Sequence, residues 1–191
     1  ADLFVTANAV NASQLLDKTW VRAAHQRSVI DITFSGRKAD VIGISIESPD
    51  FVAARIIDPL PNAYARWAQN DGDEELIFAN EQVRYLGDVE PGDTITLGTA
   101  LGLRQFIVAG FFHDYGNVNF AFHIRRNLFD VLYPAGLDQG WGIWVEPGRI
   151  ADAELGLTKM GLDSRDWISQ RDVFDLSMAI FDRTFAITRA L

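Results

Sequence analysis

The sequence contains no cysteine, and this absence removes several kinds of chemistry. Disulfides, thiolate metal sites and cysteine nucleophiles are all excluded. The compartment stays open, because chains without cysteine occur both in the reducing cytosol and in the oxidising periplasm. Long apolar runs are also missing. The longest stretch of apolar residues and glycine spans 106–112, far short of the roughly 20 residues that a membrane helix needs.

Basic side chains are few, with 17 Lys and Arg against 26 Asp and Glu, so the formal net charge is −9. Nucleic-acid binders usually concentrate Lys and Arg, and the acidic balance therefore argues against a nucleic-acid partner. The 191 residues suffice for one domain or two small lobes. A hydrophobic content of 48% and a charged content of 23% are ordinary for a globular chain and argue against disorder.

Both ends of the sequence lack the usual signals. Residue 1 is alanine, and no charged segment followed by an apolar segment comes after it, so we expect no signal peptide. A helical pattern continues to Leu191 without a Gly, Asn or Pro stop signal. We therefore expect a segment of a longer protein, with a natural helical C-terminus as the alternative.

The first fifty residues predict the order β-α-β-β. Residues 3–6 favour a short strand, and Asn11 begins a predicted helix that reaches Ala24 through apolar residues at helical spacing. Residues 28–34 and 41–46 alternate between apolar and polar side chains. The turn at 35–38 joins these two strands into a predicted hairpin.

The middle of the chain, residues 51–136, predicts a β-rich lobe in the form of a small barrel or sandwich. Its predicted helical elements are 62–68, a helix from the cap Asn80 to Leu86, and 126–132. Its predicted strands are 76–78, 94–97, 103–112 and 118–124, with a hairpin turn at 98–102.

The rest of the chain predicts β-α-β and then a long helix. The strand 140–146 carries Trp141, Ile143 and Val145 on one face. A helix over 150–160, a strand over 165–169 and a final helix from Arg171 follow. This tail is expected to complete the sheet begun at the N-terminus. The predicted division is therefore an α/β lobe formed by 1–50 and 137–191, interrupted by a β-rich lobe formed by 51–136.

Candidate chemistry is sparse. His113, Asp114 and His123 are the only residues that resemble a metal or acid–base site, and His25, on the predicted first helix, has no acidic partner four residues later. The acidic residues at 71–75 do not match a calcium loop, because Gly72 comes too early, and a solvated loop is expected. No nucleophile or phosphate-loop motif is present. We expect no catalytic residue, metal or cofactor, and no enzyme.

The predicted final helix carries two apolar rows. They contain Phe174, Phe181 and Leu191, and beside them Val173, Ile180 and Ile187. Such a helix either packs on the core of this domain or leaves the domain to contact another helix or approach a membrane. The second interpretation is favoured, because the pattern runs to the last residue without a cap.

Two segments resemble a known family. Residues 78–82 (Phe-Ala-Asn-Glu-Gln), followed by 86–97 with its Pro91-Gly92-Asp93 turn, resemble a recurring segment of FtsX-like ABC transporter permeases. A strand ending in Val108-Ala109-Gly110, the stretch 114–117 and the closing stretch 180–191 extend the resemblance. It implies an extracytoplasmic domain of the MacB periplasmic-core type, with an α+β fold in which a β-rich lobe interrupts a porter-like α/β lobe.

The same resemblance implies a function. The domain would be non-catalytic and would couple ATP-driven motion to the export or extraction of a hydrophobic or amphiphilic substrate. Its partners would be the permease's own transmembrane helices, a cytoplasmic ATP-binding subunit and a second permease copy. It would lie on the periplasmic or extracellular side of the cell inner (plasma) membrane. The alternatives are a secreted or periplasmic ligand-binding module and a hydrolase domain.

A small set of residues is expected to have structural or interface roles. They are Gly92, Asp93, Asp114, Tyr115, Gly116, Trp141, Trp144, Phe174, Phe181 and Phe185. For Trp67, Trp141 and Trp144, the alternatives are an apolar interface or substrate groove and simple filling of a core.

Overall fold

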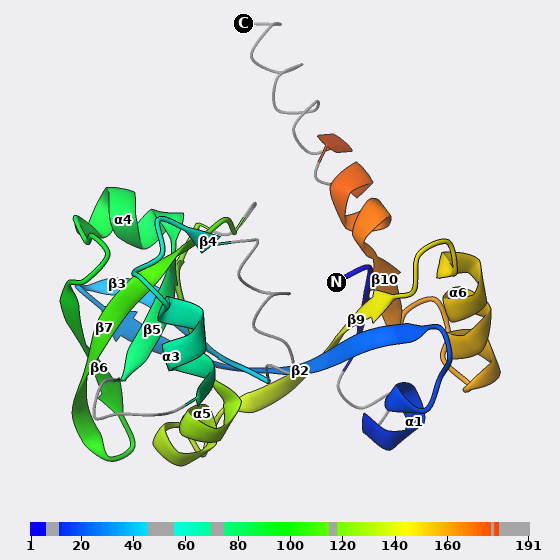
Figure 1. The fold of residues 1–191 in the computed structure, drawn as a ribbon, viewed down its shortest axis with the longest axis horizontal. Coiled ribbons are helices and arrows are strands. Elements are labelled where there is room, and N and C mark those ends of the chain that lie inside the picture. The colour runs from blue at the N-terminus through cyan, green and yellow to red at the C-terminus, as the bar shows by residue number, and fades with distance from the viewer. Residues whose placement is uncertain (7–11, 46–55, 70–74, 115–117, 177, 180–191) are drawn as a thin grey trace, which may run out of the picture. The chain divides into compact units, whose positions relative to one another are not determined.

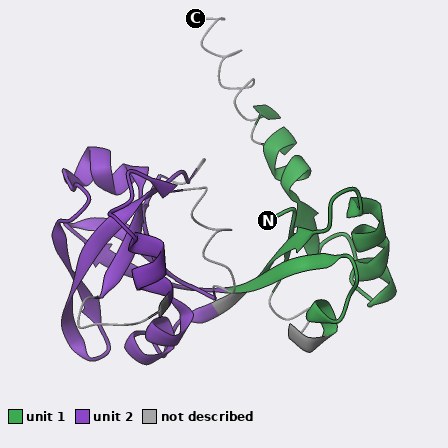
Figure 2. Ribbon diagram, in the orientation of Figure 1, with its two compact units in different colours: residues 1–26, 139–191 green, residues 27–138 purple. Residues whose placement is uncertain are grey.

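The computed structural model describes residues 1–6, 12–45, 56–69, 75–114, 118–176, 178 and 179 (Figure 1). The chain divides into two compact units (Figure 2). Unit 1 contains residues 1–26 and 139–191, and unit 2 contains residues 27–138, so unit 2 is an insertion within unit 1. Within these described ranges, no helix combines the length and the apolar character needed to cross a membrane.

Unit 1 is a small antiparallel sheet covered by helices. Its elements are β1 (Leu3–Val5), α1 (Ala12–Leu16), the first part of β2 (Val21–Phe34), most of β9 (Leu137–Val145), α6 (Ile150–Lys159) and β10 (Trp167–Ser169). Strand β1 pairs antiparallel with β9 on one side and with β10 on the other. The tail thus completes the N-terminal sheet, as the sequence predicted. Trp20, Trp141, Ile143 and Leu157 lie at the centre of its hydrophobic core.

Unit 2 is built on one mixed sheet. Its elements are the rest of β2, β3 (Arg37–Ile44), β4 (Ile56–Ile57), α3 (Ala63–Gln69), β5 (Leu76–Asn80), α4 (Glu81–Gly87), β6 (Thr94–Thr99), β7 (Gly102–Phe112), β8 (Phe120–Arg125) and α5 (Arg126–Leu132). The strand order is β2-β3-β8-β5-β7-β4, with β6 against β7. The pairs β3–β8 and β5–β7 are parallel. The pairs β2–β3, β4–β7, β5–β8 and β6–β7 are antiparallel.

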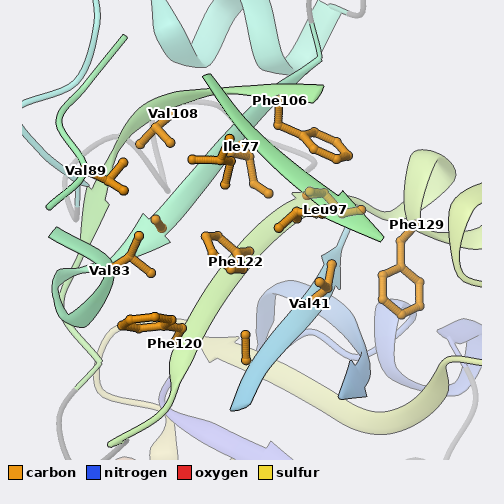
Figure 3. Packing of buried hydrophobic residues seen from close by; sticks show 14 of the residues in the cluster. Val41, Ile77, Val83, Val89, Leu97, Phe106, Val108, Phe120, Phe122 and Phe129 are labelled. Carbon is orange, nitrogen blue, oxygen red and sulfur yellow. The ribbon is translucent and has the colours of Figure 1, made fainter. Parts of the chain in front are cut away.

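Both faces of the unit 2 sheet are buried. On β3, Val41 belongs to one hydrophobic cluster and Ile42 to the other, and Ile77 and Phe78 alternate in the same way on β5. Figure 3 shows part of the first cluster, where Phe106, Phe120 and Phe122 lie among side chains from β3, β5 and β6 and from the helices α4 and α5. A sheet covered on two sides requires strands that are apolar throughout, which explains the continuous run Leu-Ile-Phe-Ala in β5.

The structure corrects three expectations, which concern the end of the first helix, the form of the middle lobe and the boundaries between the two units. The helix predicted to reach Ala24 is wrong, because α1 ends at Leu16 and β2 begins at Val21. The carbonyl of Trp20 accepts a hydrogen bond from the amide of Glu146 (2.9 Å), so pairing next to β9 overrides the weak helical pattern here. His25 consequently lies on a strand.

The other two corrections concern unit 2. The described strands form one mixed sheet with parallel pairs, rather than the predicted small barrel or sandwich. The units also divide the chain after residues 26 and 138, whereas the sequence predicted divisions after 50 and 136. The hairpin of β2 and β3 joins unit 2 because β3 pairs along its length with β8, with Val41 opposite Phe122.

Candidate functional site

The predicted turn at Gly92 and Asp93 joins α4 to β6. The amide of Asp93 donates to the carbonyl of Glu90 (3.1 Å), and Gly92 has a φ of 95°. Proline followed by a glycine of positive φ is typical of a type II turn. The Asp93 carboxylate accepts from the Glu90 amide (2.8 Å), so both residues have structural roles in the turn.

Arg84 stabilises the same turn, and sequence reasoning missed it. Its guanidinium binds Asp58 (2.7 Å) and Glu90 (3.0 Å), and these hydrogen bonds raise the pKa of Arg84. The guanidinium also lies 5.4 Å from the centre of the Phe111 ring. No local pattern connects Asp58 with Arg84, because the contact depends on the fold of the whole unit.

The two tryptophans of β9 face opposite ways. Trp141 is buried in the unit 1 core. Trp144 lies on the other face, where its ring packs edge-on against the ring of His25, with 4.8 Å between the ring centres. Trp67 is only 2% exposed and packs edge-on against Phe78 in unit 2. Trp67 and Trp141 therefore fill cores and are not available to line a groove.

Each of the three histidines makes a different contact. In unit 2, His113 bonds to the carboxylate of Glu81. His123 stacks on Phe112 with 3.8 Å between ring centres. Burial, helped by the charge of Arg27, lowers the pKa of His123 to about 3. His25 belongs to unit 1. Among the described residues, no three His, Asp or Glu side chains are grouped so as to hold a metal ion.

Asp114 ends the described stretch that follows β7 and is partly buried. Tyr115 and Gly116 lie outside the described residues, as do positions 71–74 of the acidic loop. Glu75, the last residue of that loop, lies 3.8 Å from the Arg104 guanidinium.

Side-chain hydrogen bonds fix the start of the final helix, a name used here for residues 170–176. The Ser169 hydroxyl donates to the Asp172 carboxylate (2.6 Å) and accepts from the Asp172 amide (3.0 Å). The same carboxylate accepts from the Ser169 amide (3.3 Å). These reciprocal bonds form a capping box. The spacing Ser-x-x-Asp carried this signal in the sequence, and the predicted start at Arg171 is within two residues of the observed one.

The same point of unit 1 also holds the N-terminus. The amide of Gln170 donates to the carbonyl of Asp2 (2.8 Å), and the Asp2 carboxylate accepts from the Val145 amide (2.7 Å). The start of the first strand and the start of the final helix are therefore adjacent and joined directly by a hydrogen bond. In Figure 1 the N-terminus lies close to β10.

Apolar side chains are exposed around this point. On the final helix Phe174 is 63% exposed and Leu176 is 58% exposed, and Met178 just beyond is also exposed. On the neighbouring strands, Phe4 and Ile168 pair across β1 and β10 and are both exposed. They line a surface hollow of about 570 Å³ with Val5, Thr6, Ser164, Arg165, Asp166, Trp167 and Asp172. Phe181 and Phe185 lie outside the described residues.

Comparison with known proteins defines the class of fold. No family model and no curated protein matches the sequence. Solved structures do match, and two of them are a periplasmic region and an extracellular domain of bacterial proteins.

In particular, the fold is similar to that of the periplasmic region of MacB from Actinobacillus actinomycetemcomitans. The match has a TM-score of 0.57 at 12% identity, and it covers 93% of this chain and 91% of that one. The extracellular domain of the noncanonical ABC-type transporter YknZ from Gram-positive bacteria matches with a TM-score of 0.48 at 12% identity, over 88% of this chain and 97% of that one. The MacB-like α+β fold implied by the sequence resemblance is thus confirmed.

Proposed function

We propose that this chain is a non-catalytic extracytoplasmic domain of an ABC transporter permease. The observation that carries the proposal is the MacB-like fold, which extends over 93% of the chain. The exit of the first strand and the final helix from one point of unit 1 supports it. Two membrane helices that flank a domain require both of its ends on the same side.

The proposed role is mechanical. The capping box fixes the start of the final helix to β10, and β10 pairs with β1, so a displacement of the helix moves the sheet of unit 1. A packed helix transmits such a displacement as a rigid body. The exposed apolar side chains at 173–178 are suited to contact another helix or the membrane surface.

The proposed partners follow from this role. They are the permease's own transmembrane helices, a cytoplasmic ATP-binding subunit and a second permease copy, with no nucleic acid. The domain would lie on the periplasmic or extracellular side of the inner (plasma) membrane. Its motion would drive the export or extraction of a hydrophobic or amphiphilic substrate.

Cysteine labelling of the complete natural protein tests the location. Because this chain has no cysteine, Leu155→Cys on α6 and Leu103→Cys on β7, both at exposed positions, each introduce one thiol into the domain. A membrane-impermeant maleimide is expected to label both variants in intact cells, above the background of the protein without the substitution. Labelling that appears only after lysis would overturn the proposal.

Coupling is tested separately with Phe174→Pro, which breaks the final helix, against Phe174→Ala, which preserves it. Spin labels at Leu155→Cys in the assembled transporter report distances between copies. An ATP-dependent change in distance is expected in the Ala variant and is expected to be lost in the Pro variant. If both variants respond alike to ATP, the helix does not transmit the motion.

A further inference from the structure

Strand β6 has one open edge. It pairs with β7 from Thr94 opposite Ile107 to Thr99 opposite Gly102, without a register shift. No other described strand pairs with it. An unpaired edge presents a row of amide and carbonyl groups that can bond to another extended chain.

The pairing pattern shows which groups face outward. The amide of Val108 donates to the carbonyl of Asp93 (2.9 Å), so these opposed residues form a hydrogen-bonded pair. Such pairs alternate along an antiparallel ladder, which places Ile95 and Leu97 in the same class as Asp93. The backbone amides and carbonyls of Thr94, Thr96 and Gly98 therefore face away from β7, over about 13 Å of strand.

A surface hollow of about 500 Å³ lies along this edge. Thr94, Ile95 and Thr96 of β6 form one wall. The hollow is further lined by Thr33, Phe34 and Ser35 at the turn between β2 and β3, by Asp88 and Val89 just after α4, and by Asp93 in the turn before β6. All of these residues belong to unit 2, so the hollow is contained within one unit.

Strand β6 lacks the features that protect exposed edges. Its sequence, Thr-Ile-Thr-Leu-Gly-Thr, has no lysine, no proline and no other charge, and its pairing with β7 has no bulge. Natural sheets blunt their free edges with such features or keep the edge strand very short. Strand β10, at the edge of unit 1, is only three residues long.

We propose that the open edge of β6 binds an extended basic peptide segment of a partner protein as an added strand. The backbone groups of Thr94, Thr96 and Gly98 would supply the hydrogen bonds. The charge of the occupant follows from the lining, which contains Asp88 and Asp93 and no basic side chain. Asp88 is exposed at the end of α4, where it can pair with a Lys or Arg of the added strand. This inference does not depend on the transporter assignment.

Binding is tested on the 191-residue chain with a capped, fluorescently labelled peptide of alternating valine and lysine. Saturable binding is expected by fluorescence anisotropy, and the matching valine–glutamate peptide is expected not to bind. Amide exchange measured by NMR locates the site. The amides of Thr94, Thr96 and Gly98 are expected to exchange at least about ten-fold more slowly with the peptide bound, whereas those of Ile95 and Leu97, already bonded to β7, change little.

Thr96→Pro removes one outward amide without removing a bond to β7, and proline is tolerated at such edge positions. Its affinity for the valine–lysine peptide is expected to fall about ten-fold, the effect of one lost hydrogen bond in an ordered strand. The matched control Thr96→Val keeps the amide and is expected to bind as the parent does. Asp88→Asn is expected to weaken binding about three-fold at low salt.

Three results would overturn the proposal. Equal binding by Thr96→Pro, shown to be folded by its NMR spectrum, excludes the β6 edge. Protection of amides elsewhere places the peptide at another site. A dimer of the parent chain in sedimentation that is absent in Thr96→Pro assigns the edge to a second copy of this chain.

Discussion

Asn80 is expected to be one of the most sensitive positions in unit 2. Its side chain is fully buried at the end of β5. The amide nitrogen donates to the carbonyl of Asn119 (2.9 Å), and the oxygen accepts from the amide of Ala121 (3.1 Å). The carboxamide thus continues the pairing of β5 with β8 beyond the last backbone pair, Ala79 with Phe122.

Replacing Asn80 by alanine removes both hydrogen bonds. Each is worth about 0.5–1.5 kcal/mol, and a buried amide left without a partner costs about 1–3 kcal/mol. Because the Ala121 amide has no access to water, the free energy of unfolding is expected to fall by about 2–4 kcal/mol.

Asn80→Asp gives a sharper test because only the donor is lost. An ionised carboxylate still accepts from Ala121 but faces the Asn119 carbonyl without a proton between the two oxygens. The protonated acid restores the donor, so folding raises the pKa of the new carboxyl above its unfolded value of about 3.9. The folded state then binds more protons, and the stability of the variant relative to the parent falls with rising pH, by at most about 1.4 kcal/mol per pH unit.

Urea unfolding of the parent, Asn80→Ala and Asn80→Asp between pH 4 and 7.5 measures these differences. The deficit of Asn80→Asp is expected to be smallest at pH 4 and to grow as the pH rises. Asn127→Asp, at an exposed position where the side-chain oxygen accepts from the Leu128 amide, is the matched control and is expected to show no such growth. A deficit of Asn80→Asp that is independent of pH would refute the reasoning.

Three further predictions concern other buried contacts. His123→Phe is expected to remove part of the loss of stability that the parent shows in acid. The pKa of His123 is lowered to about 3 in the folded state, so below about pH 6.5 its imidazole binds a proton in the unfolded state but not in the folded state. The free energy of unfolding of the parent therefore falls as the pH drops below about 6.5. Urea unfolding of the variant and the parent at pH 7 and pH 5 checks this, and equal losses in both would contradict it. Gly156→Ala is expected to destabilise unit 1 by about 1–2 kcal/mol in thermal unfolding, because the new Cβ would lie only 2.7 Å from the indole nitrogen of Trp20. The control is Gly87→Ala, whose Cβ would lie at an ordinary contact distance of 3.6 Å from the side chain of Val89. Ser169→Ala is expected to cost about 1 kcal/mol by opening the capping box, against no change for Ser164→Ala, and equal melting temperatures for these two variants would show that the cap contributes nothing.

Local patterns predicted most of the elements. The alternation predicted at 28–34 and 41–46 appears as the β2–β3 hairpin, in which β3 ends at Ile44. The predicted apolar face of Trp141, Ile143 and Val145 lies in the unit 1 core. Residues 21–24 form the start of β2 rather than the predicted helix. Ala23 and Ala24 favour a helix over a strand, so the extended form of this segment depends on the sheet, in which β2 lies next to β9.

Contacts between residues far apart in the sequence could not be predicted from local patterns. The parallel pairing of Val41 with Phe122 depends on segments that carry no common local signal. Asn80 was expected to cap α4, and it precedes that helix, but its side chain makes no capping bond and reaches Asn119 and Ala121 instead. The unpaired edge of β6 is likewise a property of the whole sheet, because it depends on which strands pair with one another among the described residues.

The position of the two ends determines how a load would act on the domain. Both ends belong to unit 1, where β1 and β10 are antiparallel and Asp2 lies beside Gln170. A displacement applied to both ends together leaves the hydrogen bonds between β1 and β10 unloaded, so unit 1 moves as one body. A displacement that separates the ends loads those bonds one at a time, beginning at Gln170. The arrangement therefore favours concerted motion of the first strand and the final helix, which the proposed mechanical role requires.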